Sequence, residues 1–534
     1  MTYNAETKVW SGPKVTRNIE NVLFREIIWK NLNSNPQKVF QISDDEGTEL
    51  TYSETKMHSV RVAQNLQILG IGCGDVVATV FNNSTFLAPI VFGCNLIGAP
   101  VYTFVFRIGL NVDWIKQTFE AMKPKILILE EYIESAGLIS DVLSEMNLDC
   151  KIFLVKNQEE IEDSRFQSYN EILKKTGREN DFVLPVDGMT DYSPVFILPS
   201  SGTTGPPKVM AMPGRQCKFM KYVWNFREDG VTFGYSTITW FTGLVMLLYP
   251  ILTCGTRIIT KHKFCPKHYG DIAKKYGVTV TITSTENSIA IYKSTDFNAD
   301  DFESIDEFFC GGERVPRSIR DYLSAQLKKK SFTTVYGSTE IGVISKFQTE
   351  IDLSTVKDNI VGKLRPNSQC KVVDIETRKA LGHREVGEIL TKPEASFTEY
   401  YGMPQKTKEA FEDGWYKTGD GGYVDEEGYI YVFGRIHPAE IESLIESFDG
   451  VAAACAVNVS EDIVAVLVIK LPGSNTTEDL LTDTANESLR NIKIKGGIYI
   501  VDEIPRTQSV SCKIFRPDAQ LLAIKLMNDN KLVS

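Results

Sequence analysis

A short polar loop is the first place where residue types and spacing suggest chemistry. Residues 200–208 read Ser-Ser-Gly-Thr-Thr-Gly-Pro-Pro-Lys and follow the apolar segment Val195–Leu198. Two glycines permit a tight backbone turn, and hydroxyl and backbone N–H groups can surround phosphate oxygens. Lys208 adds a mobile positive charge. The string is not a Walker P-loop, because two prolines follow Gly205. It predicts a phosphate loop, and a Ser/Thr/Gly-rich surface loop is the alternative.

This loop resembles the corresponding loop of adenylate-forming enzymes, the superfamily of acyl-CoA synthetases, beetle luciferases and peptide-synthetase adenylation domains. Other strings that resemble motifs of the superfamily follow in the expected order over nearly the whole chain, and luciferase-like fatty acyl-CoA synthetases are the most similar branch. The resemblance implies that the loop residues bind the nucleotide phosphates. These residues are Ser201, Gly202, Thr203, Thr204 and Gly205, with Lys208 as a catalytic cation.

Two strings resemble the adenine side of the superfamily's nucleotide site. In Tyr336-Gly337-Ser338-Thr339-Glu340, the resemblance implies that the Tyr336 ring packs on adenine, Thr339 touches the phosphates and Glu340 holds Mg²⁺. A carboxylate suits this hard cation. Gly337 belongs to the same motif, and Gly312 and Glu313 resemble a turn beside the adenine ring. The alternative is a turn at a strand end with an exposed glutamate.

Two further strings resemble the ribose side of that site. Trp415-Tyr416-Lys417-Thr418-Gly419-Asp420 ends in a carboxylate whose two oxygens can accept both ribose hydroxyls. Fifteen residues later, Phe433-Gly434-Arg435 ends in a guanidinium, whose rigid fork of donors suits the ribose or phosphate edge. The resemblance therefore implies that Asp420 and Arg435 bind the nucleotide.

A third region resembles the wall of the acyl pocket. Trp240-Phe241-Thr242-Gly243 stands where luciferase-like members carry a His-His-Gly-Phe string, and it resembles the Trp-x-Thr-Gly of some short- and medium-chain acyl-CoA synthetases. Trp240, Thr242 and Gly243 are therefore expected to line the pocket. A turn before a core helix is the alternative.

The C-terminal region resembles the superfamily with two departures. Pro505-Arg506-Thr507 and Lys513-Ile514-Phe515-Arg516 match the ends of its catalytic-lysine motif, but two extra residues separate Pro505 from Lys513. Lys513 remains the expected catalytic lysine. The second departure is a gap of about eleven residues after Arg435, where the superfamily carries its hinge and a Gly loop facing the CoA tunnel. His437 and Pro438 stand at this joint, and proline leaves little slack for a hinge.

The expected activity is ATP-dependent conversion of a carboxylic acid, by resemblance a fatty acid, to acyl-AMP and then to acyl-CoA. ATP, Mg²⁺ and CoA would be the cofactor and co-substrates. Two alternatives remain: an enzyme that stops at acyl-AMP because of the gap, and a non-catalytic nucleotide- or acyl-binding protein.

The elements expected to position these residues alternate between strands and helices, which indicates parallel sheets with crossover helices. We expect an α/β fold in which residues 1–435 form an AMP-binding domain of parallel α/β subdomains plus a small β-rich subdomain. Residues 436–534 would form a small α+β lid. The expected strands are 75–81, 125–129, 150–155, 195–198, 257–260, 278–283, 333–336, 370–374, 388–391, 422–425, 429–433, 451–457, 463–469 and 497–501, and the expected helices are 112–122, 135–146, 438–447 and one near 474–490.

Composition bounds the remaining possibilities. The chain has 534 residues, 43% of them hydrophobic, and a net charge of −11, which argues against a nucleic-acid partner. Ten cysteines without CxxC spacing and only five histidines argue against a zinc site. Residues 76–106 carry no charge and could span a bilayer, but their Asn, Pro and Gly residues favour buried elements. No secretory signal is visible, which favours an intracellular location, peroxisomal by resemblance or cytoplasmic, although Asn530–Ser534 is not a peroxisomal tripeptide signal.

Overall fold

The computed structural model describes most of the chain. It covers residues 1–16, 22–104, 112–130, 133–156, 158–199, 208–224, 227–327, 331–348, 359–375, 377–435, 441–442, 445–460, 463–488, 494, 496–506 and 514–531.

The first of three sheets has eight strands in the order β21-β11-β10-β6-β5-β7-β8-β9. The six strands from β10 to β9 run parallel, and β11 and β21 extend one edge antiparallel. The predicted strands at 75–81, 125–129, 150–155 and 195–198 are confirmed. The strands are β5 Val77–Val80, β6 Val101–Thr103, β7 Ile126–Leu129, β8 Lys151–Leu154, β9 Phe166–Ser168, β10 Pro194–Pro199, β11 Val209–Pro213 and β21 Glu399–Tyr400, and the helices between them are α3 Leu87–Leu96, α4 Val112–Met122, α5 Ile133–Glu145 and α6 Asn170–Leu173.

The second sheet has sixteen described strands, and its centre is parallel from β16 through β15, β14, β12 and β13 to β3. The predicted strands at 257–260, 278–283 and 333–336 lie in this centre. The central strands are β3 Val39–Ser43, β12 Val231–Phe233, β13 Thr256–Ile259, β14 Val280–Ser284, β15 Glu307–Gly311 and β16 Ser331–Ser338, with β4 Thr48–Thr51 at the edge, and the neighbouring helices are α1 Phe24–Leu32, α2 Tyr52–Ile68, α7 Gly214–Val223, α8 Phe241–Thr253, α9 Pro266–Tyr276, α10 Thr285–Lys293 and α11 Arg317–Gln326.

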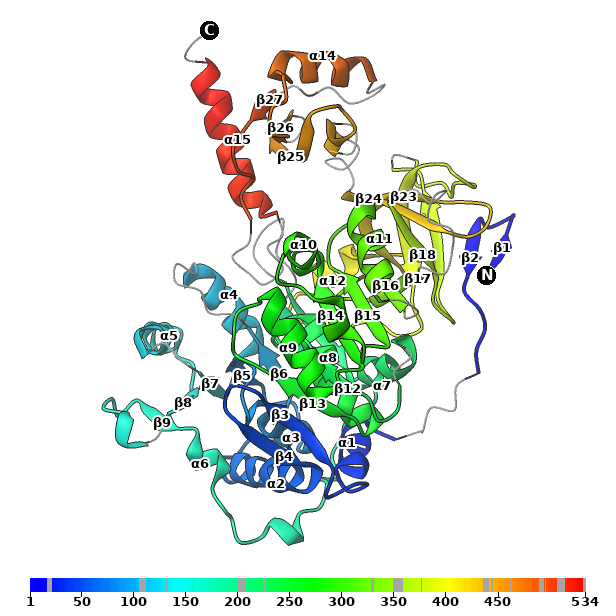
Figure 1. The fold of residues 1–534 in the computed structure, drawn as a ribbon. Coiled ribbons are helices and arrows are strands. Elements are labelled where there is room, and N and C mark those ends of the chain that lie inside the picture. Colours follow the sequence, from blue (N-terminus) through cyan, green and yellow to red (C-terminus); the bar gives the residue numbers. More distant parts are fainter. Residues whose placement is uncertain are drawn as a thin grey trace.

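The predicted β-rich region continues this second sheet instead of forming a sheet of its own. The link is β17 (Gly342–Gln348), which pairs antiparallel with both β16 and β18. The N-terminal hairpin, β1 and β2, joins this region because β2 pairs with β19, and Figure 1 shows it in blue beside the yellow β-rich strands. The β-rich strands are β1 Thr2–Asn4, β2 Val9–Ser11, β18 Ile360–Leu364, β19 Gln369–Val373, β20 Gly387–Lys392, β22 Phe411–Glu412, β23 Trp415–Val424 and β24 Ile430–Arg435, with helix α12 at Pro404–Glu409.

The described residues of the charge-free stretch, 76–104, include β5, α3 and β6, as its Asn, Pro and Gly residues predict. All ten residues of α3 are buried. Gly93 lets this helix approach α2, because a Cβ there would lie 2.6 Å from the Val62 side chain. Among the residues that the structure describes, no helix combines the length and the apolar character that a membrane crossing needs.

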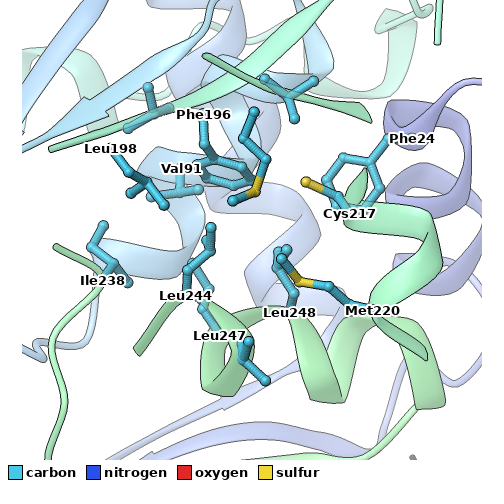
Figure 2. Packing of buried hydrophobic residues seen from close by; sticks show 14 of the residues in the cluster. Phe24, Val91, Phe196, Leu198, Cys217, Met220, Ile238, Leu244, Leu247 and Leu248 are labelled. Atoms are coloured by element: carbon cyan, nitrogen blue, oxygen red, sulfur yellow. The ribbon is translucent and has the colours of Figure 1, made fainter. Parts of the chain in front are cut away.

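A large apolar core holds α7 and α8 against the first sheet. Figure 2 shows Phe196 and Leu198 of β10 facing Leu244 and Leu248 of α8, with Cys217 and Met220 of α7 beside them. All six side chains are at most 2% exposed. The starts of α7 and α8 are therefore fixed in place, which matters for the site below.

The C-terminal residues build a separate three-stranded sheet. Strand β25 (Val451–Ser460) pairs antiparallel with β26 (Ile463–Lys470), which pairs parallel with β27 (Ile498–Ile500). Helix α14 (Glu478–Ser488) and the unpredicted helix α15 (Arg516–Lys531) complete this part (Figure 1). The predicted strands and the helix near 474–490 are confirmed. The proposed domain boundary at residue 436 lies outside the described residues and stays a prediction, and the helix expected at 438–447 is described only in part.

Candidate active site

The carboxyl ends of β15 and β16 bring the two adenine-side strings together. Gly311 is the register partner of Val335, so Gly312 emerges beside Tyr336. Gly312 adopts φ +104°, a backbone conformation that glycine favours. The backbone oxygen of Glu313 accepts a hydrogen bond from Thr285 Oγ1 at 3.1 Å. Parallel strands present their carboxyl ends along one edge, which is where ligands of such sheets bind.

A tight hairpin between β16 and β17 carries Thr339 and Glu340. A Cβ on Gly337 would lie 2.0 Å from the Gly342 backbone oxygen, so the motif tolerates no side chain there. The Glu340 backbone oxygen accepts a hydrogen bond from the Phe397 N–H at 2.7 Å. Thr339 and Glu340 are half-buried at the tip of this hairpin.

The predicted adenine and ribose residues meet directly. The Tyr336 hydroxyl donates a 2.7 Å hydrogen bond to Asp420 Oδ2. Asp420 lies in the middle of β23, where its N–H donates to Thr418 Oγ1 at 3.0 Å and the buried Thr418 hydroxyl donates to the Ile389 oxygen at 2.6 Å. The register between β23 and β24 places Arg435 opposite Asp420.

Tyr400 connects two other predicted residues, and the sequence interpretation missed it. Its hydroxyl donates to Glu340 Oε1 at 3.1 Å, and Lys208 Nζ lies 4.8 Å from the centre of its ring. Tyr400 is 3% exposed and belongs to β21, whose register partner Met210 lies two residues after Lys208. A two-residue strand has no periodic pattern, so only the Tyr400-Tyr401 pair before Pro404 could have drawn attention.

A small cavity of about 10 Å³, room for about one water molecule, lies next to the Glu340 hairpin. Its lining includes Phe241 from the predicted acyl-pocket string, but among the described residues it does not include Trp240, Thr242 or Gly243. Trp240 is the N-cap of α8, and Thr242 Oγ1 donates to Ser236 Oγ at 3.0 Å. A Cβ on Gly243 would lie 1.9 Å from the Thr237 oxygen. The lining residues are Gln216, Phe219, Met220, Trp224, Phe241, Ile341, Gly342, Arg365 and Ala395.

Several predicted residues belong to segments that the structure does not describe. Ser201 to Gly205 and Lys513 lie outside the described residues, as does His437, and the Arg435 side chain is not described. Two residues on either side of Lys513 in the chain, Arg506 and Ile514, form an antiparallel bridge. Arg516 forms a bidentate ion pair with Glu442, at 2.8 and 3.1 Å.

The metal-ligating side chains that the structure describes suit a magnesium ion that is bound partly by substrate phosphates. They suit a metal held by protein ligands alone less well. Within the described ranges, no three His, Cys, Asp or Glu side chains cluster as a metal site, and the nine cysteines there are free thiols. Glu340 is a single carboxylate at the hairpin tip. Mg²⁺ is commonly held by one or two carboxylates together with substrate phosphates, so this donor fits the ion.

The chain is similar to known proteins over most of its length. The family model of AMP-binding enzymes matches residues 28–401, and that of the AMP-binding enzyme C-terminal domain matches residues 440–510. The chain is 26% identical to "Probable 4-coumarate--CoA ligase 1" of Dictyostelium discoideum, covering 90% of this chain and 92% of that protein. It is also 26% identical to "Fatty acid--[acyl-carrier-protein] ligase ScoC" of Streptomyces coeruleorubidus, over 87% and 90% of the two chains.

Solved structures show the same fold. The luciferase-like enzyme from the nonluminescent mealworm Zophobas morio superposes with a TM-score of 0.71 at 26% identity, covering 80% of this chain and 99% of that one. ATP-bound MatB from Rhodopseudomonas palustris superposes with a TM-score of 0.78 at 20% identity, covering 95% and 100%. Because these family models together match most of its length, the chain belongs to the AMP-binding enzymes of the adenylate-forming superfamily.

Proposed function

We propose that this protein activates a carboxylic acid with ATP to give acyl-AMP and pyrophosphate, and then transfers the acyl group to the thiol of CoA with release of AMP. The observation that carries the proposal is the gathering of Tyr336, Asp420, Glu340 and Lys208 by strand ends and hairpins of the two sheets. Tyr336 and Asp420 would bind the adenosine, and Lys208 would face the phosphates.

The first step is an in-line displacement at the α-phosphorus. The substrate carboxylate forms a new P–O bond while the bond to pyrophosphate breaks, and negative charge spreads over the phosphate oxygens. Lys208 and Lys513 are proposed to stabilise this charge electrostatically. Glu340 would hold Mg²⁺, which when bound neutralises charge on the leaving pyrophosphate. Tyr400 keeps the Glu340 carboxylate oriented through its hydroxyl.

The substrate is proposed to be an acid with an apolar body, fatty or aromatic. The relatives named above include both a 4-coumarate–CoA ligase and a fatty acid–carrier protein ligase. The apolar side chains beside the Glu340 hairpin also favour such a body, and they include Phe219, Met220, Phe241 and Ile341.

A second candidate is an enzyme that stops at acyl-AMP. Only residues 436–439 separate Arg435 from Glu440, and one of them is Pro438. A thioester step that requires the C-terminal part to rotate needs a hinge that absorbs a large backbone change, and this short joint offers few residues for it.

One experiment separates the candidates: ATP–pyrophosphate exchange with a panel of acids, with and without CoA. Exchange together with CoA-dependent AMP release supports the full reaction. Exchange without thioester for any acid supports the second candidate. ATP binding without exchange, unchanged in Lys513→Ala, would show a non-catalytic binding protein. Imaging of a tagged chain beside a peroxisomal marker tests the expected peroxisomal or cytoplasmic location.

A further inference from the structure

The strand that carries Asp420 leaves its regular pairing with the neighbouring strand around this residue. Between two regular pairs of β20 and β23, residues 418–420 face the single residue Ile389. Gly419 lies in the middle of this bulge with φ +69°, a backbone conformation that glycine favours. Bulges are frequent next to active sites, where they redirect a side chain. The direction of the Asp420 side chain therefore depends on what holds the bulge in shape.

The carboxylate of Glu388 contacts the bulge from β20. The Gly419 N–H donates to Glu388 Oε1 at 3.2 Å, and Glu388 is only 6% exposed. Glu388 Oε2 accepts a 2.6 Å hydrogen bond from Arg378 Nη1. Arg378 belongs to the connection between β19 and β20, and it also pairs with Glu412 of β22 at 2.7 Å. Glu388 therefore joins an arginine outside the bulge to the backbone directly before Asp420.

A buried carboxylate is a costly way to satisfy one backbone N–H. A charge that is removed from water loses hydration free energy, and replacing a buried ion pair by apolar side chains is often neutral or even stabilising. Stability alone therefore does not require a glutamate here. What the carboxylate supplies is geometry, because its two oxygens bond to Gly419 on one side and to Arg378 on the other.

We propose that Glu388 is a positioning residue of the nucleotide site, and that it directs Asp420 toward the ribose hydroxyls of ATP by holding Gly419. This inference rests on the proposed function, in which Asp420 binds the ribose. Asp420 is then fixed from two directions. The Tyr336 hydroxyl holds its Oδ2 atom, and Glu388 holds the backbone one residue earlier.

Discrimination between nucleotides distinguishes this role from a purely structural one. A ribose hydroxyl that donates to a charged acceptor should favour ATP over the deoxynucleotide lacking that hydroxyl by roughly 10-fold or more. If Glu388 directs Asp420, its loss reduces this preference, because the misdirected carboxylate no longer meets the hydroxyls. If Glu388 contributes to stability alone, the folded fraction of a variant keeps the preference unchanged.

The test compares ATP, 2′-deoxy-ATP and 3′-deoxy-ATP with the full chain. Pyrophosphate exchange with the best acid of the panel above gives kcat and KM for each nucleotide, and the shift in melting temperature reports binding independently of turnover. Glu388→Leu removes the acceptor, and Arg378→Met removes the group that orients it. Glu412→Gln is the matched control, because Glu412 pairs with the same arginine while its strand pairs with Trp415, outside the bulge.

We expect Glu388→Leu to raise the KM for ATP by roughly 10-fold with a smaller change in kcat, and to reduce the preference for ATP by roughly 3- to 10-fold. Arg378→Met should act in the same direction by a smaller factor, and Glu412→Gln should behave like the wild type. A preference that survives in both Glu388→Leu and Arg378→Met overturns the inference, as does a wild type that prefers ATP over neither deoxynucleotide.

A failure to fold does not leave the inference undecided. The Arg378 side chain is 31% exposed, so Arg378→Met is the milder change, and it decides the case if Glu388→Leu does not fold. Equal nucleotide preferences in Arg378→Met and Glu412→Gln would then overturn the inference. If no acid supports exchange, the proposed function fails. The melting shifts then decide the role of Glu388 separately: a preference for ATP that is lost in the variants supports it, and an unchanged or absent preference rejects it.

Discussion

The Tyr336 hydroxyl donates a 2.7 Å hydrogen bond to Asp420 Oδ2, which joins two residues 84 positions apart in the chain. Tyr336 is near the end of the central strand β16, and Asp420 lies in β23 of the β-rich region. The bond orients the carboxylate proposed to bind ribose through the ring proposed to contact adenine. Because each carboxylate oxygen has two acceptor sites, this bond to Oδ2 fixes the orientation of Asp420 and is compatible with both oxygens accepting ribose hydroxyls.

Tyr336→Phe should therefore weaken ATP binding while retaining the ring. A hydrogen bond to a charged group contributes about 1.5–3 kcal/mol, so we expect the KM for ATP to rise by roughly 10-fold or more, with a smaller change in kcat. Asp420→Asn tests the other partner and should act in the same direction. The double variant should lose less than the sum of the two. Additive losses in a double-mutant cycle would show that the bond does not couple the two side chains.

Tyr400→Phe should impair the response to Mg²⁺. The ring stays next to Lys208, but Glu340 loses the hydroxyl that donates to Oε1. Loss of one such hydrogen bond predicts a fall in exchange of roughly 3- to 10-fold and a higher Mg²⁺ concentration at half-maximal rate. Glu340→Gln, which removes the carboxylate charge, should cost about 10²–10³-fold.

Tyr401→Phe is the control for this pair of variants, since Tyr401 follows directly in the chain and its N–H, which the substitution keeps, bonds to the Val209 oxygen. An unchanged Mg²⁺ dependence in Tyr400→Phe would show that Tyr400 does not orient Glu340.

Features that depend on neighbouring residues in the chain could be predicted from the sequence, whereas features that depend on contacts between distant residues could not. Strands such as β5, β7 and β14 were predictable, because short apolar, β-branched runs between polar turns indicate buried strands. The hairpin β1–β2 was not, because its partner β19 lies more than 350 residues away. The same holds in the site. Tyr336 and Asp420 were found as motif residues, whereas Tyr400 matters only through the contacts that folding gives it with Glu340 and Lys208, which no local pattern encodes.

Lys346 should make stability depend on pH in the alkaline range. It lies on β17, with Nζ 5.1 Å from the Phe309 ring centre, and burial lowers its pKa from 10.5 to about 8. Arg365 adds to this shift and Glu307 opposes it. Between these two pH values the unfolded chain binds more protons than the folded one, so the Lys346 contribution to stability rises with pH.

Lys346→Met should remove this slope. Between pH 8 and 10.5, the unfolding free energy of the wild type should rise by on the order of 1–3 kcal/mol relative to that of the variant. This energy is smaller than the full pKa shift implies, because Lys346 is partly exposed. Denaturant unfolding of both proteins at several pH values measures the difference between their unfolding free energies. The titration of the buried tyrosines is common to both proteins and cancels in this difference. Parallel curves for the two proteins would contradict the shifted pKa.

Arg516→Met should destabilise the C-terminal part of the chain more than the rest. Arg516 pairs in bidentate fashion with Glu442 and also donates to the Ala456 oxygen at 2.7 Å, and the Ala456 N–H donates to Glu442 Oε1 at 2.8 Å. Burial raises the pKa of Glu442, and Arg516 counters this. Removing the arginine leaves a buried carboxylate without its countercharge, which costs about 3–5 kcal/mol.

The local nature of this loss makes it testable. Hydrogen exchange should accelerate in β25 and β26 while β14 to β16 stay protected, and ATP should still bind at Tyr336 and Asp420. Arg384→Met is the matched control, since its ion pair with Glu426 is about half exposed and should contribute at most about 1 kcal/mol. Replacing both partners, as Arg516→Met with Glu442→Leu, should recover much of the lost stability, because no charge then remains buried.

The same ion pair has an expected effect on activity. Because Arg516 follows Lys513 by three residues, and Glu442 follows Arg435 by seven, this ion pair connects the segment that carries the proposed catalytic lysine to the segment at the shortened joint. We therefore expect Arg516→Met to lose pyrophosphate exchange and the double variant to recover it. If exchange persists in Arg516→Met while hydrogen exchange in β25 accelerates, Lys513 does not take part in the first chemical step.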